Sequence, residues 1–335
     1  MSSPTPAPGT AAAPAPHVVE DCLGFVQLLS DGTVRRSTDY SMLRPTGRVP
    51  SDSDLPVQWK DVVYDDTHGL RLRIREKKKL PVLVYFHGGG FCLLSFEMTS
   101  FHAGALRLAA ELPALVLSAD YRLAPEHRLP AALDDAESVF SWLRAQATST
   151  SSAAGAGADP WLAESADFAR VFVSGDSAGG NISHHVAVRH GSDGGLALAP
   201  LRLAGCVMLW PYFGGEEPTP SEAACPADQV MGPALFDQMW RLALPAGATK
   251  DHPFAPGSVP LGDLGAAFPP VLVVDPDQDP LHDRVVDYVA RLKAAGKAVE
   301  LVVFAGQGHG FFITEPCGEA SDELIRVIRR FVHGA

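Results

Sequence analysis

The feature that most constrains this chain is the pentapeptide Gly-Asp-Ser-Ala-Gly at residues 175–179, which directly follows the apolar run 170–174. A G-x-S-x-G turn between a buried strand and a helix exposes its serine at the apex, because the small residues let the chain turn sharply and the helix pack closely. Ser177 is therefore a candidate nucleophile. The same pentapeptide is also typical of an ordinary glycine-rich turn, so other motifs must decide between the two interpretations.

A run of glycines upstream supplies a candidate oxyanion hole. Residues 87–91, His-Gly-Gly-Gly-Phe, follow the strand-like apolar run 81–86. Consecutive glycines have no Cβ, so two backbone N–H groups can point at one spot. We predict that the N–H groups of Gly89 and Gly90 act together with that of Ala178, the residue after the candidate nucleophile. A phosphate-binding loop would need a lysine and a serine or threonine after the glycines, where this chain has Phe-Cys-Leu.

His309 is the candidate base among the twelve histidines of the chain. It lies between two glycines, late in the chain and beyond the apolar run 299–304. Sites of this type follow the chain order serine, acid, histidine. An acid that leaves room for one helix and one strand before His309 would orient the imidazole and stabilise its protonated form. The candidates after the apolar run 271–274 are Asp275, Asp277, Asp279 and Asp283, of which the spacing favours Asp279, with Asp277 as the alternative.

Apolar runs and helical patterns alternate along the chain and predict the fold class. Continuous apolar runs are typical of buried parallel strands, and a turn at 67–69 predicts that the first two strands form a hairpin. We predict strands at 61–64, 70–75, 81–86, 114–119, 170–174, 203–210, 271–275 and 299–304, with helices at about 99–111, 131–146, 177–190, 283–295 and 321–332. This is an α/β fold with an eight-stranded, mostly parallel sheet and helices on both faces. The catalytic groups should lie beyond the carboxyl ends of the strands.

Two segments, about 17–45 and 212–250, stand outside this alternation. They are rich in apolar residues, and the second contains a predicted helix at 234–244. They could simply pack against the core. Alternatively, they form a cap over the serine that supplies an apolar substrate pocket, since small-molecule sites are mostly apolar. In that case the predicted substrate-contacting residues are Phe25, Leu28, Leu29, Phe91, Phe236 and Trp240.

Five motifs in this order resemble those of plant carboxylesterases in the hormone-sensitive-lipase branch of the α/β-hydrolases. They are residues 87–91, 120–127, 175–181, 279–283 and 309–311. The resemblance implies an α/β-hydrolase fold and also selects Asp279, the first aspartate of the D-P-L-x-D signature. The motif at 120–127 is expected to be structural, with Asp120 paired to Arg122. Segments 20–29, 212–217 and 240–245 are similar, more narrowly, to a subgroup with strigolactone-hydrolysing members.

Other members of this branch set the alternatives. Gibberellin receptors lack the catalytic histidine and carry a serine at the position of Gly90, whereas this chain has His309 and Gly90. Isoflavanone dehydratases use similar machinery to eliminate water. The resemblance therefore implies a serine carboxylesterase acting on a small apolar ester or lactone, with a strigolactone as one candidate. A non-catalytic hormone receptor and a dehydratase or acyl transferase are the alternatives.

Net charge and cysteine content limit the kinds of molecule that this protein is expected to bind. The net charge of −12 argues against nucleic acid and anionic membrane surfaces, which both require basic patches. Five scattered cysteines without a C-x-x-C pair fit reduced thiols. We expect a protein of the cytoplasm that can also enter the nucleus, that is a monomer or homodimer, and that needs no cofactor. We also expect no metal, because the histidines at 184, 185 and 190 have no acidic or thiolate partner at ligand spacing.

The sequence predicts a disordered tail followed by a single domain. Residues 1–16 are rich in proline and alanine and lack the basic and apolar regions of a secretory signal, so they should be disordered. The chain has no apolar run long enough for a transmembrane helix. Residues 17–335 should form one domain that includes the cap segments, with a surface loop at 148–158.

Overall fold

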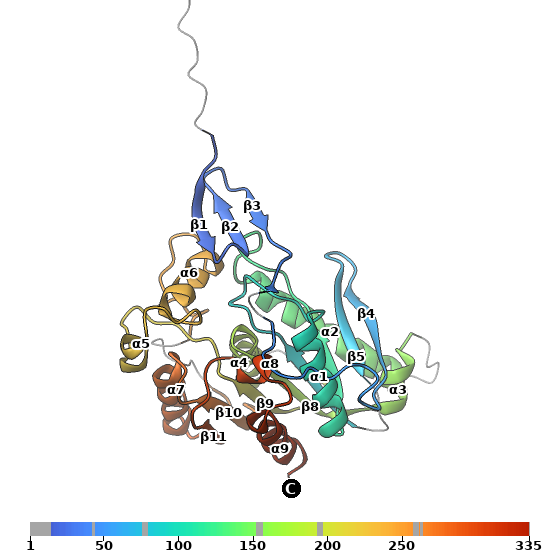
Figure 1. The fold of residues 1–335 in the computed structure, drawn as a ribbon. Coiled ribbons are helices and arrows are strands. Elements are labelled where there is room, and N and C mark those ends of the chain that lie inside the picture. Colours follow the sequence, from blue (N-terminus) through green and yellow to red (C-terminus); the bar gives the residue numbers. More distant parts are fainter. Residues whose placement is uncertain are drawn as a thin grey trace, which may run out of the picture.

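Eight strands pair into one sheet at the centre of the molecule (Figure 1). The computed structural model describes residues 15–41, 44–75, 80–151, 157–192, 197–256, 261 and 264–334. The expected tail at 1–16 therefore lies almost wholly outside the described residues, as does part of the expected loop at 148–158. The strands are β4 Trp59–Asp65, β5 Leu70–Arg75, β6 Leu80–Phe86, β7 Leu115–Ala119, β8 Ala166–Asp176, β9 Leu203–Leu209, β10 Val271–Pro276 and β11 Val299–Phe304.

The strand order in this sheet is β11-β10-β9-β8-β6-β7-β5-β4. The six strands from β11 to β7 are parallel, while β5 pairs antiparallel with both β7 and β4. All eight predicted strands are present, and the prediction of a mostly parallel sheet is confirmed. The carboxyl ends of β8, β10 and β6 meet at one edge, which is where ligands bind in open sheets of this kind.

Helices cover both faces of the sheet. They are α1 Thr99–Glu111, α2 Ala131–Ser151, α3 Pro160–Ser165, α4 Ala178–Gly191, α5 Pro220–Ala224, α6 Pro233–Ala243, α7 His282–Ala294, α8 Phe311–Thr314 and α9 Glu319–His333. One hydrophobic cluster joins α2, α4 and α7 to the sheet, and a second joins α1 and α9 to its opposite face. No helix of the described ranges combines the length and apolar character needed to cross a membrane.

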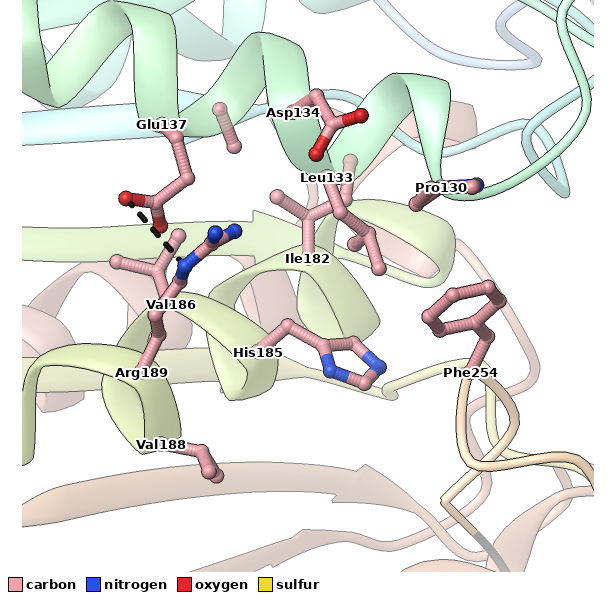
Figure 2. A pocket seen from close by; sticks show the side chains of 11 residues that line it. Pro130, Leu133, Asp134, Glu137, Ile182, His185, Val186, Val188, Arg189 and Phe254 are labelled. Atoms are coloured by element: carbon pink, nitrogen blue, oxygen red, sulfur yellow. Dashed lines mark ion pairs between the residues drawn. The ribbon is translucent and has the colours of Figure 1, made fainter. Parts of the chain in front are cut away.

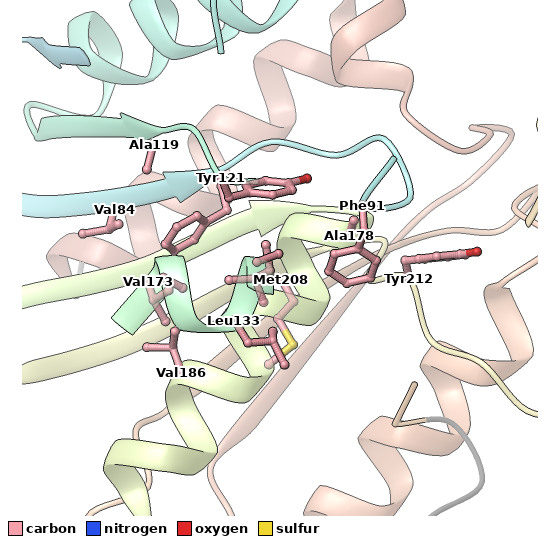
Figure 3. Packing of buried hydrophobic residues seen from close by; sticks show 14 of the residues in the cluster. Val84, Phe91, Ala119, Tyr121, Leu133, Val173, Ala178, Val186, Met208 and Tyr212 are labelled. Atoms are coloured by element: carbon pink, nitrogen blue, oxygen red, sulfur yellow. The ribbon is translucent and has the colours of Figure 1, made fainter. Parts of the chain in front are cut away.

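Alternation along the strands separates these two clusters. Val82 and Val84 of β6 belong to the first cluster, whereas Leu83 and Tyr85 belong to the second. Successive strand residues point to opposite faces, and every one of these four side chains is buried. Figure 3 shows Val84, Val173 and Met208 of three neighbouring strands packed against Leu133 and Val186 of the covering helices. The run of apolar residues thus reflects burial on both faces.

The N-terminal segment forms a small sheet of its own. Strands β1 Val18–Cys22, β2 Val26–Leu29 and β3 Val34–Arg36 pair antiparallel in that order. This sheet lies beside α6, away from the central sheet (Figure 1). Arg241 of α6 forms an ion pair with Glu20 of β1, with Nε 2.7 Å from Oε1. The two segments proposed as a cap are therefore in contact.

Candidate active site

The turn at Ser177 joins β8 to α4 with a strained backbone. Ser177 has φ 51° and ψ −113°, a conformation that side-chain-bearing residues rarely adopt. Its N–H donates to the carbonyl of Leu209 (2.9 Å), which fixes the turn to the neighbouring strand. A Cβ on Gly179 would lie 1.9 Å from the carbonyl oxygen of Phe86, so the close approach of helix and strand depends on glycine at that position.

His309 lies between Ser177 and Asp279. Its Nε2 is 2.9 Å from Ser177 Oγ, and its Nδ1 is 2.7 Å from Asp279 Oδ2. The other oxygen of Asp279 accepts a hydrogen bond from the N–H of Leu281 (2.9 Å). The side chains of His309 and Asp279 are only 3% and 1% exposed. This arrangement allows the imidazole to take a proton from Ser177 while the buried carboxylate stabilises the positive charge.

The other three candidate carboxylates have different partners. Asp275 lies 2.7 Å from His282 Nδ1, and burial raises its pKa to about 7. Asp277 accepts a hydrogen bond from the N–H of Gly306 (2.7 Å). Asp283 accepts from the N–H of Ser221 (2.7 Å). Of the four, Asp279 is the one that the structure brings to His309.

The glycine loop after β6 lies next to this line of side chains. Gly89 and Gly90 have φ values of +112° and +59°, and both border the same cavity as Ser177. A Cβ on Gly89 would lie 2.2 Å from the carbonyl oxygen of Leu93, so this loop also depends on glycine. Ala178 is the first residue of α4, and the first N–H groups of a helix have no acceptor within it. The structure thus brings all three predicted donors to one region.

The loop after β7, which contains the motif at 120–127, packs against the glycine loop. Tyr121 donates its hydroxyl to the carbonyl of His87 (2.8 Å), and the two rings stack with centroids 4.3 Å apart. His87 Nε2 lies 3.3 Å from Asp120 Oδ1. The predicted pair of Asp120 with Arg122 is wrong, because Arg122 instead binds Asp135 of α2, with Nη2 2.7 Å from Oδ1. The motif at 120–127 is structural, as expected, but through other contacts.

Sequence reasoning missed Asp176 as a member of this site. Its carboxylate is 3% exposed, borders the cavity and accepts the hydroxyl of Tyr85 (2.8 Å). Burial raises the pKa of Asp176 to about 6. A Cβ on Gly88 would lie 2.4 Å from its Oδ2, so the carboxylate packs directly against the glycine loop. Its place inside the G-x-S-x-G motif was the available signal.

An apolar cavity of about 300 Å³ lies beside Ser177 and His309. Its walls come from the cap, from α1 and from the loops at the carboxyl ends of the strands. The ring of Phe236 lies 5.1 Å from that of His309, measured between centroids. Apolar side chains that line it include Leu23, Phe25, Met98, Leu235, Phe236 and Met239. A cavity with such a lining suits an apolar substrate.

Comparison with known proteins agrees with this geometry. The family model of the alpha/beta hydrolase fold matches residues 83–313. The chain belongs to the α/β-hydrolase family. It is similar to Carboxylesterase 20 of Arabidopsis thaliana, with 35% identity over 320 residues that cover 90% of this chain and 94% of the relative.

This hydrolase has further relatives with different names. The 2-hydroxyisoflavanone dehydratase of Glycyrrhiza echinata is 35% identical over 325 residues, covering 92% of this chain and 94% of the relative. Among solved structures, an esterase of Pyrobaculum calidifontis superposes with a TM-score of 0.70 at 28% identity, covering 84% of this chain and 87% of that chain. Each of these two matches extends over most of this chain.

The hydrolase places only two of the six predicted substrate-contacting residues, Phe25 and Phe236, on the cavity wall. The other four predictions are not supported, since Leu28, Leu29, Phe91 and Trp240 are outside the described lining of the cavity. Trp240 stacks on Tyr212 with centroids 4.2 Å apart, and Phe91 packs 5.8 Å from Trp240. These side chains join the cap to the core instead.

A second, smaller cavity of the hydrolase lies between α2 and α4. It measures about 200 Å³ and is lined by Leu133, Ile182, His185 and Phe254, among others (Figure 2). At its edge Arg189 lies 3.9 Å from Glu137. Burial lowers the pKa of His185 to about 4, so its ring is neutral at pH 7. The catalytic candidates are not among the described residues that line this cavity.

Within the described part of the hydrolase, one group of side chains has the proximity expected of metal ligands. Ligand atoms of Asp65, His68 and Asp135 lie within 4.8 Å of one another. However, Asp135 binds the guanidinium of Arg122, whose Nη1 also lies 3.3 Å from His68 Nε2. A cation is therefore already supplied by the chain, and the group is an ion-pair network.

Proposed function

We propose that this protein is a serine carboxylesterase that hydrolyses small apolar carboxylic esters or lactones through an acyl-enzyme on Ser177. The observation that carries the proposal is the unbroken line from Asp279 through His309 to Ser177, which ends at an apolar cavity. The similarity to carboxylesterases and to solved esterases supports the same reaction class. The protein is a carboxylic ester hydrolase. We infer its mechanism and its substrate class from the residues of this site.

The mechanism uses the contacts described above. Ser177 Oγ attacks the ester carbonyl carbon while His309 Nε2 takes its proton, and Asp279 stabilises the imidazolium. The oxyanion accepts hydrogen bonds from the N–H groups of the glycine loop and of Ala178. His309 then protonates the leaving alkoxide as the carbonyl re-forms. Water then enters, loses a proton to His309 and attacks the acyl carbon. The bond from Ser177 Oγ to the acyl carbon breaks, His309 returns the proton to Oγ, and the acid leaves.

The substrate we propose is a bulky apolar ester or lactone, with a strigolactone as the first natural candidate. The apolar cavity wall supports this class, because burial of apolar surface is its main source of binding energy. Leu23, Phe25 and Tyr212, in segments that resemble the strigolactone-hydrolysing subgroup, border the cavity. In a lactone, the leaving alkoxide stays joined to the acyl group through the ring carbons, so hydrolysis of the acyl-enzyme gives a single hydroxy acid.

The test is a set of p-nitrophenyl esters of increasing chain length, run beside a synthetic strigolactone and a 2-hydroxyisoflavanone. We expect hydrolysis of the esters and ring opening of the lactone, with the products detected by mass spectrometry and both activities lost in Ser177→Ala. Elimination of water from the hydroxyisoflavanone without ester hydrolysis would make the protein a dehydratase. Tight binding of the lactone without any product would favour the receptor alternative.

A further inference from the structure

Arg36, at the end of β3, reaches out of the N-terminal sheet to two loops of the main domain. Its Nη1 donates to the carbonyl of Cys92 (2.6 Å), and its Nη2 donates to the carbonyl of Ala124 (2.7 Å). The carboxylate of Glu126 accepts from Nε (2.7 Å) and Nη2 (2.5 Å) of the same guanidinium. The Arg36 side chain is 27% exposed. A planar guanidinium with this many partners is held in one orientation.

The first of these loops contains two of the three proposed oxyanion donors, Gly89 and Gly90. The N–H groups of Cys92 and Leu93 donate to the carbonyl of Gly89, at 3.0 and 2.9 Å. That carbonyl and the N–H of Gly90 belong to the same planar peptide unit. The direction of the Gly90 N–H therefore depends on the position of the Cys92 backbone. Arg36 restrains that backbone by donating a hydrogen bond to the carbonyl of Cys92.

The second loop completes the connection. Ala124 donates its N–H to the carbonyl of Phe91 (2.9 Å), while its own carbonyl accepts from Arg36. Arg36 thus joins the two loops at the point where the glycine loop ends. Arg36 is not among the described residues that line the cavity, so this effect needs no contact with the substrate.

We propose that Arg36 is a positioning residue for the oxyanion hole, so that the N-terminal sheet acts on stabilisation of the transition state as well as covering the cavity. The proposal rests on the esterase function proposed for Ser177. A small displacement of a catalytic group can cost about a hundredfold in rate, so loss of the Arg36 contacts should affect kcat. Substrate binding by the cavity walls should change much less.

The matched control is Arg241, whose guanidinium binds Glu20 of the same sheet and, among the described residues, makes no hydrogen bond or ion pair with the glycine loop. The variants Arg36→Ala, Arg36→Lys and Arg241→Gln are compared on p-nitrophenyl acetate. Affinity for an aryl trifluoromethyl ketone is measured in parallel. Ser177 Oγ adds to the carbonyl carbon of this ketone, and the hydroxyl proton of Ser177 passes to His309. The resulting oxyanion then occupies the oxyanion hole. Melting temperatures are recorded for each variant.

We expect Arg36→Ala to lower kcat about tenfold to a hundredfold, with little change in KM, and to weaken the trifluoromethyl ketone by a similar factor. Arg36→Lys should recover part of the loss, and millimolar guanidinium should recover part of it in Arg36→Ala. Arg241→Gln should keep both quantities near wild type.

Two results would overturn the proposal. The first is a wild-type kcat and ketone affinity in a folded Arg36→Ala. The second is an equal loss of kcat and of ketone affinity in Arg36→Ala and Arg241→Gln, in proportion to the fall in melting temperature of each variant. If the wild-type protein itself neither hydrolyses the ester nor binds the ketone, the proposed esterase function fails, and this proposal fails with it.

Discussion

Asp279 Oδ2 lies 2.7 Å from His309 Nδ1, and both side chains are almost completely buried. The second oxygen of Asp279 is held by the N–H of Leu281, so the carboxylate cannot rotate away from the imidazole without losing a hydrogen bond. Asp277, two residues earlier, instead accepts a hydrogen bond from the N–H of Gly306. This difference makes the two aspartates separable by mutation.

Asp279→Asn should lower kcat by about 10⁴, because an amide no longer holds the imidazole in the required tautomer. Asp277→Asn should stay within about threefold of wild type, since an asparagine oxygen can still accept the Gly306 N–H. Both variants are measured by steady-state hydrolysis of p-nitrophenyl acetate after their circular dichroism spectra are matched. The reverse ranking would assign the acid to Asp277.

Gly179→Ala and Gly90→Ala should fail for different reasons. The Cβ at position 179 meets the backbone oxygen of Phe86 at 1.9 Å, which cannot move aside, so we expect a loss of more than about 4 kcal/mol in stability. The Cβ at position 90 meets the flexible Met239 Sδ at 2.0 Å. That variant should fold but lose about a hundredfold in kcat. Urea denaturation and ester hydrolysis, run on both proteins, distinguish the two effects.

Phe236→Ala should act on substrate size. Its ring borders the cavity and lies beside His309, and a buried aromatic contact is worth about 1.5–3 kcal/mol. We expect kcat/KM for p-nitrophenyl hexanoate to fall about tenfold and that for the acetate to fall less. Leu28→Ala, a partly buried position outside the described cavity lining, is the control. Equal losses on both esters in Phe236→Ala would exclude its role in substrate fit.

Asp176→Asn should alter the dependence of stability on pH. Burial disfavours the carboxylate of Asp176 and raises its pKa from the ordinary value of 3.8 to about 6 in the folded protein. The folded state therefore holds a proton that the unfolded state has lost, and Asp176 destabilises the fold progressively between about pH 4 and pH 6. The difference amounts to about 3 kcal/mol.

In urea titrations, the stability of Asp176→Asn relative to wild type should rise across that interval and level off above it. A constant difference from pH 4 to pH 7 would mean that Asp176 titrates with an ordinary pKa.

The elements that sequence predicted well are those whose stability is local or uniformly apolar. Each central strand is buried on both faces and reads as a continuous apolar run, which is why β6 and β10 could be located. Strands β1 to β3 are three to five residues long and lack such runs. They depend on contacts with residues far along the chain, such as Arg241, which a local sequence pattern does not show. Helix α5 was missed although Thr219 and Glu222 form a capping box that is visible in the sequence.

In the candidate site, too, the residues set by local motifs were predicted and the contacts set by packing were not. The nucleophile, base and glycine loop are carried by short motifs whose spacing reflects one chain topology. Partners that depend on three-dimensional packing were not predictable, as with Arg122, whose carboxylate partner comes from α2. Hydrophobicity also could not tell cavity from core on α6, where Phe236 borders the cavity and Trp240 stacks on Tyr212.

The most direct test of the central claim is covalent labelling of Ser177 combined with turnover. A fluorophosphonate probe should label the wild-type protein at Ser177, located by peptide mass spectrometry, and block hydrolysis of p-nitrophenyl acetate in proportion to labelling. Ser177→Ala and His309→Ala should lose nearly all hydrolysis, leaving only the small residual rate that binding and the oxyanion hole provide. Hydrolysis at the wild-type rate in Ser177→Ala, or labelling at another residue, would contradict the account.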